Sequence, residues 1–340
     1  MKFSKKKILF YLIFFIALYF FATYQLPYYI QKPGNTEPLN PIVEVADAYE
    51  SEGEMYLVTV SGLQATPLHY ILAKILPHNE IKPLHEVIPE GISTDDYMHA
   101  QLQVMESSQE ASLVVAYEAA GRDIKIDYAG VYVVSVVEDM PSFGKLEMGD
   151  LITRIDGIEI TESTDLINYV EEKAAGETIT VELLREDEQL TEEITLDYFP
   201  DDETRVGMGI SLVTDREVTV NPEVEFSSGQ IGGPSAGLMF ALEIYDQLIE
   251  EDITKGYEIA GTGEIDYEGN VYRIGGIDKK VVSADREGID IFFAPHEEGR
   301  EDSNYVVAKE KAEEIGTAME IVPVDTFNDA LEYLEALPEK

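Results

Sequence analysis

The chain opens with three stretches that differ in how apolar and polar residues alternate. Residues 8–26 are uncharged and almost continuously apolar, and at about 1.5 Å per helical residue such a run nearly crosses a hydrocarbon layer of ~30 Å. Residues 42–62 contain β-forming runs, and residues 66–120 change to a largely helical pattern. We therefore expect an apolar N-terminal helix and then a mixed strand and helix region over 42–123, which packs with the other domains.

The rest of the chain shows two further patterns. Residues 124–200 contain short strand-like runs around one helical stretch. Residues 204–337 alternate strands and helices. The fold class predicted from these patterns is α+β: an N-terminal transmembrane helix, a small β-rich domain over 124–200 and a C-terminal α/β domain over 204–337. The strands of the β-rich part are expected at 131–137, 151–155, 178–184 and 192–197, and its helix at 165–174.

The flanks of the apolar N-terminal run are those of a membrane anchor. Lysines precede it at positions 2, 5, 6 and 7, and such lysines stay on the cytoplasmic side of a membrane. A cleaved signal peptide is the alternative, but no A-x-A-like cleavage site follows the run. We expect a cytoplasmic tail over 1–7, an uncleaved transmembrane anchor over 8–30, a linker over 31–41, and an extracellular remainder attached to the cell membrane.

The net charge of the chain restricts the classes of partner that it can bind. The 67 acidic and 24 basic residues give a formal net charge of -43, which argues against nucleic acid as a partner because phosphate backbones need clustered Lys and Arg. Such acidity aids solubility, and a saline or alkaline habitat would also favour it.

The chain has no cysteine, so disulfides, thiol catalysis and Cys-based zinc sites are excluded. The histidines show no H-E-x-x-H spacing, and we expect neither metal nor cofactor.

Residues 144–157 form a compact motif, GKLEMGDLITRIDG, in which turns separate two short strands. The motif resembles the L-x-x-G-D-x-I-x-x-I-x-G pattern of PDZ domains, and the resemblance covers about 75 residues. It implies a groove where a bound peptide adds a strand to a sheet edge and a Φ-G-Φ loop holds the peptide carboxylate. A purely structural β-domain is the alternative. On the resemblance, the peptide-binding loop is Gly130, Val131, Tyr132 and Val133.

Two residues in the C-terminal part are candidates for chemistry. Ser235 lies in GGPSAG (residues 232–237), just before an amphipathic helix, where exposed backbone N–H groups can stabilise an oxyanion. Lys280 ends GGIDKK (residues 275–280) and precedes two valines. Burial there would lower its pKa toward neutrality, and a neutral lysine can take the proton of a serine hydroxyl. Taken alone, such a serine is more often a helix cap and such a lysine a solvated surface residue, as we expect for Lys279.

Three motifs in order strengthen this interpretation. PSAG (residues 234–237), TGE (residues 262–264) and GGIDKK resemble the P-S-A-G, T-G-E and G-G-[LI]-x-x-K motifs of the Lon-type (S16) proteolytic domain. The resemblance extends over about 130 residues. It implies that Ser235 is the nucleophile, Lys280 the general base and Thr262 the residue that orients the lysine. Gly233, Pro234 and Ala236 are then the supporting residues of the serine turn.

The order of anchor, PDZ-like part and Lon-type part is similar to that of PDZ-containing Lon-like membrane proteases of Gram-positive bacteria, which have no ATPase. The sequence also contains no G-x-x-x-x-G-K-[ST] phosphate loop. The resemblance implies an ATP-independent serine endopeptidase that cleaves flexible peptides or unfolded proteins presented by the PDZ domain. Gly232 stands where many full-length Lon proteins carry an acidic residue linked to activity switching. Those proteins form hexameric rings, and a homo-oligomer is compatible with this sequence.

Two other functions fit parts of the sequence. GPSAG (residues 233–237) also matches the G-x-S-x-G elbow of α/β-hydrolases, which needs a downstream histidine, and His296 is the only one. A catalytically inactive surface scaffold that binds extended peptides is the non-enzymatic alternative, although Ser235, Lys280 and Thr262 are all present. Cleavage and peptide binding by a Ser235→Ala variant distinguish these functions.

Overall fold

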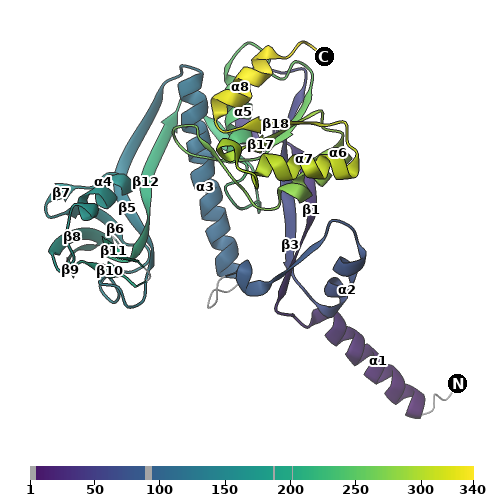
Figure 1. Ribbon diagram of the computed structural model, residues 1–340, viewed down its shortest axis with the longest axis horizontal. Helices are drawn as coiled ribbons and strands as arrows, with labels where there is room; N and C mark the ends of the chain where they lie inside the picture. Colours follow the sequence, from purple (N-terminus) through teal and green to yellow (C-terminus); the bar gives the residue numbers. More distant parts are fainter. Residues whose placement is uncertain (1–4, 89–93, 187, 201) are drawn as a thin grey trace. The chain divides into compact units, whose positions relative to one another are not determined.

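The computed structural model describes residues 5–88, 94–186, 188–200 and 202–340, so Lys2 of the expected basic tail lies outside the described residues (Figure 1). The chain forms two compact units. We call Met1–Asp123 together with Val220–Lys340 the discontinuous unit, and Ile124–Thr219 the inserted unit. The predicted combination of an apolar N-terminal helix with mixed α and β structure is confirmed.

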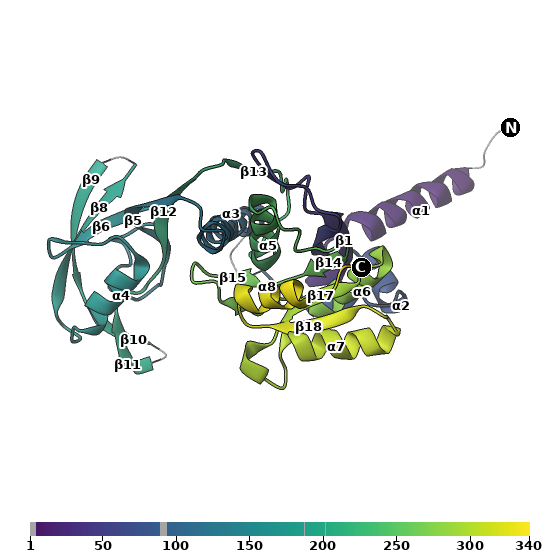
Figure 2. The same cartoon turned by 90° about the horizontal axis from the view of Figure 1, so that it is seen from above.

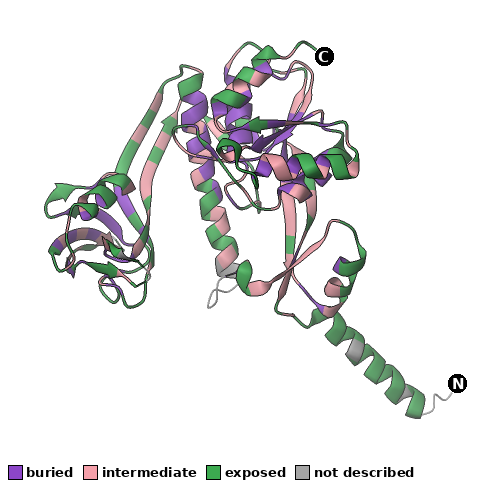
Figure 3. Cartoon of the chain, viewed as in Figure 1, coloured by how far each residue is buried: buried purple, intermediate pink, exposed green. Residues whose placement is uncertain are grey.

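The N-terminal helix α1, Lys5–Thr23, is the one helix among the described residues that is long and apolar enough to cross a membrane. None of its apolar window is buried within the protein (Figure 3). The helix is shorter than the anchor predicted over 8–30, because residues 28–30 belong to strand β1, Tyr28–Pro38. Pro27 cannot continue a helix, and β-forming aromatic and branched residues follow it.

Strand β1 lies inside the main sheet, so the linker predicted over residues 31–41 is wrong. β1 pairs antiparallel with β3, Glu54–Gln64, on one side and with the short strand β4, Glu80–Pro83, on the other. Its prolines misled the prediction. β4 pairs only with the first four residues of β1, and the β1–β3 register shifts between Pro33 and Thr36. A proline is tolerated at such a bulge because no ladder donor is needed there.

The discontinuous unit is built on a six-stranded sheet of order β18-β17-β14-β3-β1-β4. β3 and β14, Glu258–Gly261, run parallel, and so do β17, Ile291–Pro295, and β18, Glu320–Val324, beyond them. All five residues of β17 are buried. Parallel strands of this kind read as continuous apolar runs because helices cover both faces of the sheet.

Neighbouring residues of β17 point to helices on opposite faces. Phe292 packs with α6, Ile277–Glu287, and α7, Asn304–Ile315, whereas the ring of Phe293 meets Tyr333 of α8, Phe327–Ala336. Figure 2 shows β18 passing between α8 and α7. Helix α5, Gly237–Leu248, lies on the α8 side and is covered in turn by α3, Thr94–Ala119. The shorter elements are β2 (Val43–Val45), α2 (Pro67–Ile75), η1 (Leu84–Glu86), β13 (Val224–Phe226), β15 (Glu264–Ile265), β16 (Val271–Tyr272) and η2 (Glu297–Gly299).

The inserted unit is a small sheet of order β12-β5-β6-β8-β9 with one helix, α4, Ser163–Glu171. The four predicted strands and the predicted helix are present, although β5 begins seven residues before the predicted start at residue 131. The unit extends past the predicted boundary at residue 200, since β12 returns to pair with β5. The strands are β5 (Ile124–Val136), β6 (Leu151–Ile155), β7 (Ile158–Glu159), β8 (Thr178–Arg185), β9 (Glu188–Thr195), β10 (Asp197–Phe199), β11 (Asp202–Gly207) and β12 (Ile210–Val220).

The Gly-Asp step of the motif at 144–157 has a structural role. Asp150 is fully buried and accepts two hydrogen bonds of 2.7 Å from the guanidinium of Arg185 in β8. The backbone N–H of Glu147 donates a third bond of 2.8 Å to the same carboxylate. A buried carboxylate needs such a complete set of donors. The motif thus fixes the turn before β6 to β8, the neighbouring strand of the sheet.

Candidate active site

Ser235 lies in the turn that leads into α5, for which Ala236 is the N-cap residue. Gly233 is buried and has φ = 93°, a left-handed conformation that favours glycine. The carbonyl of Pro234 accepts hydrogen bonds from Gly237 N at 3.2 Å and from Ser108 Oγ at 3.0 Å. The supporting residues predicted around the serine therefore shape and fix its turn.

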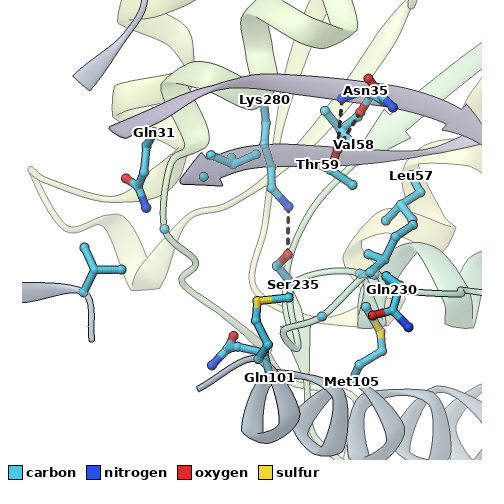
Figure 4. Close-up of a pocket in the computed structure, with 18 of the residues that line it drawn as sticks. Gln31, Asn35, Leu57, Val58, Thr59, Gln101, Met105, Gln230, Ser235 and Lys280 are labelled. Atoms are coloured by element: carbon cyan, nitrogen blue, oxygen red, sulfur yellow. Dashed lines mark hydrogen bonds between the residues drawn. The ribbon is translucent and has the colours of Figure 1, made fainter. Parts of the chain in front are cut away.

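Lys280 lies in the first turn of α6 and points at Ser235. Its Nζ donates a hydrogen bond to Ser235 Oγ at 2.8 Å (Figure 4). A second hydrogen bond from Nζ reaches Thr262 Oγ1 at 2.9 Å. Only 3% of the residue is exposed. Because burial disfavours the ammonium form, it lowers the pKa of Lys280 to about 7. A large fraction of this amine is therefore neutral at physiological pH.

Thr262 connects the serine and the lysine through one hydroxyl group. Its Oγ1 donates to the backbone carbonyl of Ser235 at 2.8 Å, so its lone pairs are left to accept from Lys280. Gly263 N donates to the same carbonyl at 3.0 Å. The structure thus brings together the three residues that the separate motifs predicted. Ser235 lies before α5, Thr262 follows β14 and Lys280 lies on α6.

The expectation that the N-terminus of α5 holds an oxyanion needs correction. Gly237 N is bonded to Pro234 O, and Leu238 N is bonded to Gly263 O at 3.1 Å. These donors stabilise the turn itself. The N–H groups of Ser235 and Ala236 belong to residues that line the cleft, and they are the better placed candidates.

The cleft beside Ser235 has a volume of about 360 Å³. Strands β1 and β3 form one wall and α3 another, and Figure 4 shows Gln101 and Met105 of α3 across Ser235 from the strand residues. This space can take several side chains of an extended peptide. Its apolar lining consists of Leu57, Val58, Val60, Val87, Met98, Met105 and Ile231, and its polar lining includes Gln31, Asn35, Glu37, Thr59 and Gln101.

Helix α3 holds the serine turn, a role that we did not predict for residues 66–120. Gln101 O accepts from Gly233 N at 2.8 Å, and Ser112 Oγ donates to Gly237 O at 2.8 Å, next to the Ser108 bond. The signal in the sequence was the pair of serines four residues apart on an otherwise apolar helix face. The same contact explains Gly232, since a Cβ there would lie 2.9 Å from Gln101 Cβ.

Lys279 is not the solvated residue that we expected. It is as buried as Lys280, and its Nζ donates to Glu80 Oε2 at 2.6 Å and to both carboxylate oxygens of Asp278 at 3.1 Å. Consecutive residues of a helix point about 100° apart, so one lysine can face the serine while the other faces β4. The ion pair ties the helix that carries Lys280 to strand β4.

The structure also corrects the predicted peptide-binding loop. Gly130, Val131, Tyr132 and Val133 all lie in β5, and Val131 and Val133 belong to the core of the inserted unit. β5 is paired on both sides, by β12 and β6, so it has no free edge to which a peptide strand could add.

A groove of about 370 Å³ lies elsewhere in the inserted unit, between α4 and the start of β12. β12 is the end strand of the sheet among the described residues, and such an edge can accept a peptide strand. The sequence signal that we missed is a second Φ-G-Φ pattern, Met208-Gly209-Ile210. The groove is lined by Leu166, Ile167, Val170, Glu171, Phe199 and residues 205–212.

Two alternative chemistries find no matching geometry. His296 pairs with Asp325, with Nδ1 and Oδ2 3.5 Å apart, and Lys280 contacts Ser235 in the place that a hydrolase histidine would occupy. Within the described ranges, no group of three or more His, Cys, Asp or Glu side chains is arranged to hold a metal ion.

Comparison with protein families assigns both parts of the chain. The PDZ domain family matches residues 97–196, and the Lon protease (S16) C-terminal proteolytic domain family matches residues 172–337. The second match contains Ser235, Thr262 and Lys280. Both matches cross the borders of the two units, because one unit is inserted in the other.

Similar proteins bear the same names. The chain is 34% identical to a Lon protease of Aster yellows witches'-broom phytoplasma over 28% of its own length and 11% of that protein. It is 30% identical to a Lon protease of Campylobacter jejuni over 39% of its length and 17% of that protein, so the chain spans less than a fifth of these curated relatives. A PDZ domain of an SdrC-like protein from Listeria monocytogenes is 37% identical over 26% of this chain and 93% of that structure, with a TM-score of 0.24. The chain thus combines a PDZ domain with a Lon-type (S16) C-terminal proteolytic domain.

Proposed function

We propose that this protein is a serine endopeptidase with a Ser235–Lys280 dyad. One observation carries the proposal: a buried lysine amine with a pKa near 7 lies 2.8 Å from the serine hydroxyl. A general base is most effective when its pKa is close to the working pH. The hydrogen-bond distance is that of a nucleophile and its base.

The reaction follows from this geometry. Neutral Lys280 takes the Ser235 hydroxyl proton as Oγ attacks the scissile carbonyl, and N–H groups of the serine turn stabilise the oxyanion. The lysine ammonium then gives its proton to the departing amine, which leaves an acyl-serine ester. Water, deprotonated by Lys280, hydrolyses the ester, releases the carboxylic product and restores Ser235. Thr262 positions the amine throughout.

The cleft supports flexible peptides as the substrate class. Its walls include strands β1 and β3, beside which a substrate segment can lie in an extended form. The reaction above uses no nucleotide. We therefore propose that this chain cleaves flexible peptides or unfolded proteins without ATP.

The inserted unit supports presentation of peptides. A peptide that lies beside β12 would add a strand to the sheet and place an apolar side chain against Leu166 and Val170 of α4. The glycine-containing segment Met208–Ile210 lies at one end of this groove, where backbone N–H groups can receive a terminal carboxylate.

Helix α1 supports attachment to the cell membrane as a single span. Lysines at positions 5–7 precede its apolar part, which favours a cytoplasmic N-terminus and extracellular catalytic and PDZ domains.

The proposal is tested with the full chain in phospholipid nanodiscs. Casein and a peptide library are incubated with wild type, Ser235→Ala, Lys280→Met and the control Lys309→Met, an exposed lysine on α7, without nucleotide and with a chelator. We expect cleavage by wild type and the control only. Cleavage by Ser235→Ala or Lys280→Met at the wild-type rate overturns the dyad, and peptide binding without cleavage by wild type favours the scaffold function.

A further inference from the structure

We propose that α2 is an interfacial helix that lies on the surface of the membrane crossed by α1. The inference concerns a second contact with the lipid bilayer and rests on the proposed membrane anchorage of α1. It is carried by the apolar stripe of α2, by its connection to the segment after α1 and by the absence of Asp and Glu from residues 1–36 and 55–79.

The outward face of α2 is apolar along its whole length. Its large side chains recur at i, i+3, i+4, i+7 and i+8, the spacing of one helix face. These side chains are 40 to 72% exposed, whereas Ala73 and Tyr70 on the opposite face pack against β1 and β4 residues. A contiguous exposed stripe of this kind marks a contact surface. The stripe consists of Leu68, Ile71, Leu72, Ile75 and Leu76.

The segment just before α2 is hydrogen-bonded to the segment just after α1. Leu26 N donates to Ala65 O at 2.7 Å, and Ala65 N donates to Tyr28 O at 2.8 Å. α2 begins two residues after Ala65, at Pro67, and Figure 1 shows it beside the C-terminal end of α1. The 19 residues of α1 cover roughly 28 Å, about the hydrocarbon thickness of a bilayer. If α1 crosses the membrane, α2 therefore begins at its surface.

The charges around α2 suit a lipid surface. Residues 55–79 contain no Asp or Glu, although 67 of the 340 residues of the chain are acidic, and residues 1–36 contain none either. These two acid-free segments meet at the junction of α1 and α2. The rings of Tyr28 and Tyr70 lie 5.1 Å apart, and Lys74 Nζ lies 4.7 Å above the Tyr70 ring. Tyrosine and lysine are the residues that favour the membrane interface.

A lipid surface explains the stripe better than a second protein chain. The stripe lies on a helix whose preceding segment is hydrogen-bonded to the segment after α1. Anionic headgroups would repel carboxylates, so the absence of Asp and Glu from residues 55–79 suits a lipid surface. Binding of a protein partner does not require this absence.

The cysteine-free sequence allows a direct test in the full chain. Single-cysteine variants are labelled with an environment-sensitive fluorophore and reconstituted in vesicles of phosphatidylethanolamine and phosphatidylglycerol that carry a nitroxide-labelled lipid. Ile71→Cys and Ile75→Cys probe the stripe, and Phe15→Cys probes α1. Ile158→Cys, an equally exposed apolar position in the inserted unit, is the matched control. We expect quenching at positions 15, 71 and 75 that is severalfold stronger than at position 158.

The outcomes separate the two claims. Quenching at position 15 without quenching at 71 and 75 overturns the interfacial helix and leaves the anchor in place. Absence of quenching at position 15 overturns the anchor. Disulfide-linked dimers of unlabelled Ile75→Cys, without lipid quenching of the labelled variant, assign the stripe to a second copy of the chain and also overturn the inference. Peptidase activity of each labelled variant shows that it is folded.

Discussion

The side-chain hydroxyl of Thr262 donates a hydrogen bond of 2.8 Å to the main-chain carbonyl of Ser235. Ser235, the proposed nucleophile, therefore also orients the hydroxyl that accepts a hydrogen bond from the Lys280 amine. The Thr262 hydroxyl both donates and accepts a hydrogen bond. Valine and other apolar residues have no hydroxyl, so they cannot hold the Lys280 amine in this position.

We predict that Thr262→Val lowers kcat/KM by about 10- to 100-fold, and that Thr262→Ser restores most of the loss. An acceptor stabilises the lysine ammonium, so its removal should also shift the pH profile of the variant to lower pH. Steady-state kinetics from pH 5.5 to 9.5 measure both effects. A valine variant with an unchanged rate and profile would contradict a positioning role.

The pH dependence of wild type should reflect the buried amine. Since the pKa of Lys280 is lowered to about 7 by burial, we predict that kcat/KM rises with pH through a single ionisation near 7 and levels off above pH 8. Measurement with an uncharged model peptide avoids titration of the substrate. An activity that falls between pH 6 and 8 is incompatible with lysine as the base.

The burial of Lys280 should lower the free energy of unfolding of the protein at pH 7. The folded pKa of Lys280 lies below its ordinary value of 10.5, so the unfolded chain binds more protons between pH 7 and 10.5. The free energy of unfolding contributed by this group therefore rises with pH across that window. We predict that Lys280→Met abolishes cleavage yet stabilises the fold at pH 7, by at most about 5 kcal/mol. Thermal unfolding of the two proteins at pH 7 and 10 tests this, and the gain should shrink at the higher pH.

Glu243, a buried acid on α5, should give the opposite pH dependence of stability: its contribution to the free energy of unfolding should fall as pH rises. Burial raises the pKa of Glu243 to about 8, and its Oε1 accepts from Gln247 Nε2 at 2.7 Å. The folded state thus keeps a proton that the unfolded state releases above its ordinary pKa of 4.5, so stability from this group is lost as pH rises from 4.5 to 8. We predict that Glu243→Gln stabilises the protein at pH 9 by roughly 1–3 kcal/mol and has little effect at pH 5. The exposed Glu44→Gln serves as control, and equal effects at both pH values would refute the prediction.

The groove beside α4 should bind the PDZ ligand. Ile167 lines it and is partly exposed, so a charge there should weaken peptide binding without unfolding the unit. We predict that Ile167→Glu raises the Kd of a peptide with an apolar C-terminus by about tenfold, or about 1.4 kcal/mol, and that Ile158→Glu, an exposed position outside the groove, does not. Fluorescence anisotropy measures both. Equal binding by the two variants would remove the ligand from this groove.

The sequence predicted the three residues that the structure brings together, but not their surroundings. Ser235, Thr262 and Lys280 each lie in a short glycine-containing motif, because the backbone conformation that each needs is set within a few residues. The hydrogen bonds between the serine turn and Gln101, Ser108 and Ser112 of α3 link residues more than 100 positions apart in the sequence. No local sequence pattern specifies which turn a helix will contact.

Strand pairing explains the other errors. β1 contains two prolines and a glycine, which locally favour a linker, and only its pairing with β3 and β4 makes it a strand. Gly130 and Gly209 both lie in Φ-G-Φ patterns, and which one borders the groove depends on whether its strand is interior or at the edge of the sheet. The order of strands in a sheet is a long-range property, and the sequence pattern alone does not determine it.

The discontinuous unit also sets the order in which the parts of the proposed active site are synthesised. The walls of the cleft, β1, β3 and α3, precede the inserted unit in the chain, whereas Ser235 and Lys280 follow it. A growing chain therefore exposes the apolar helix first and completes the inserted unit next, at a time when it has neither Ser235 nor Lys280. The proposed dyad can form only once Lys280, in the last third of the chain, has been synthesised.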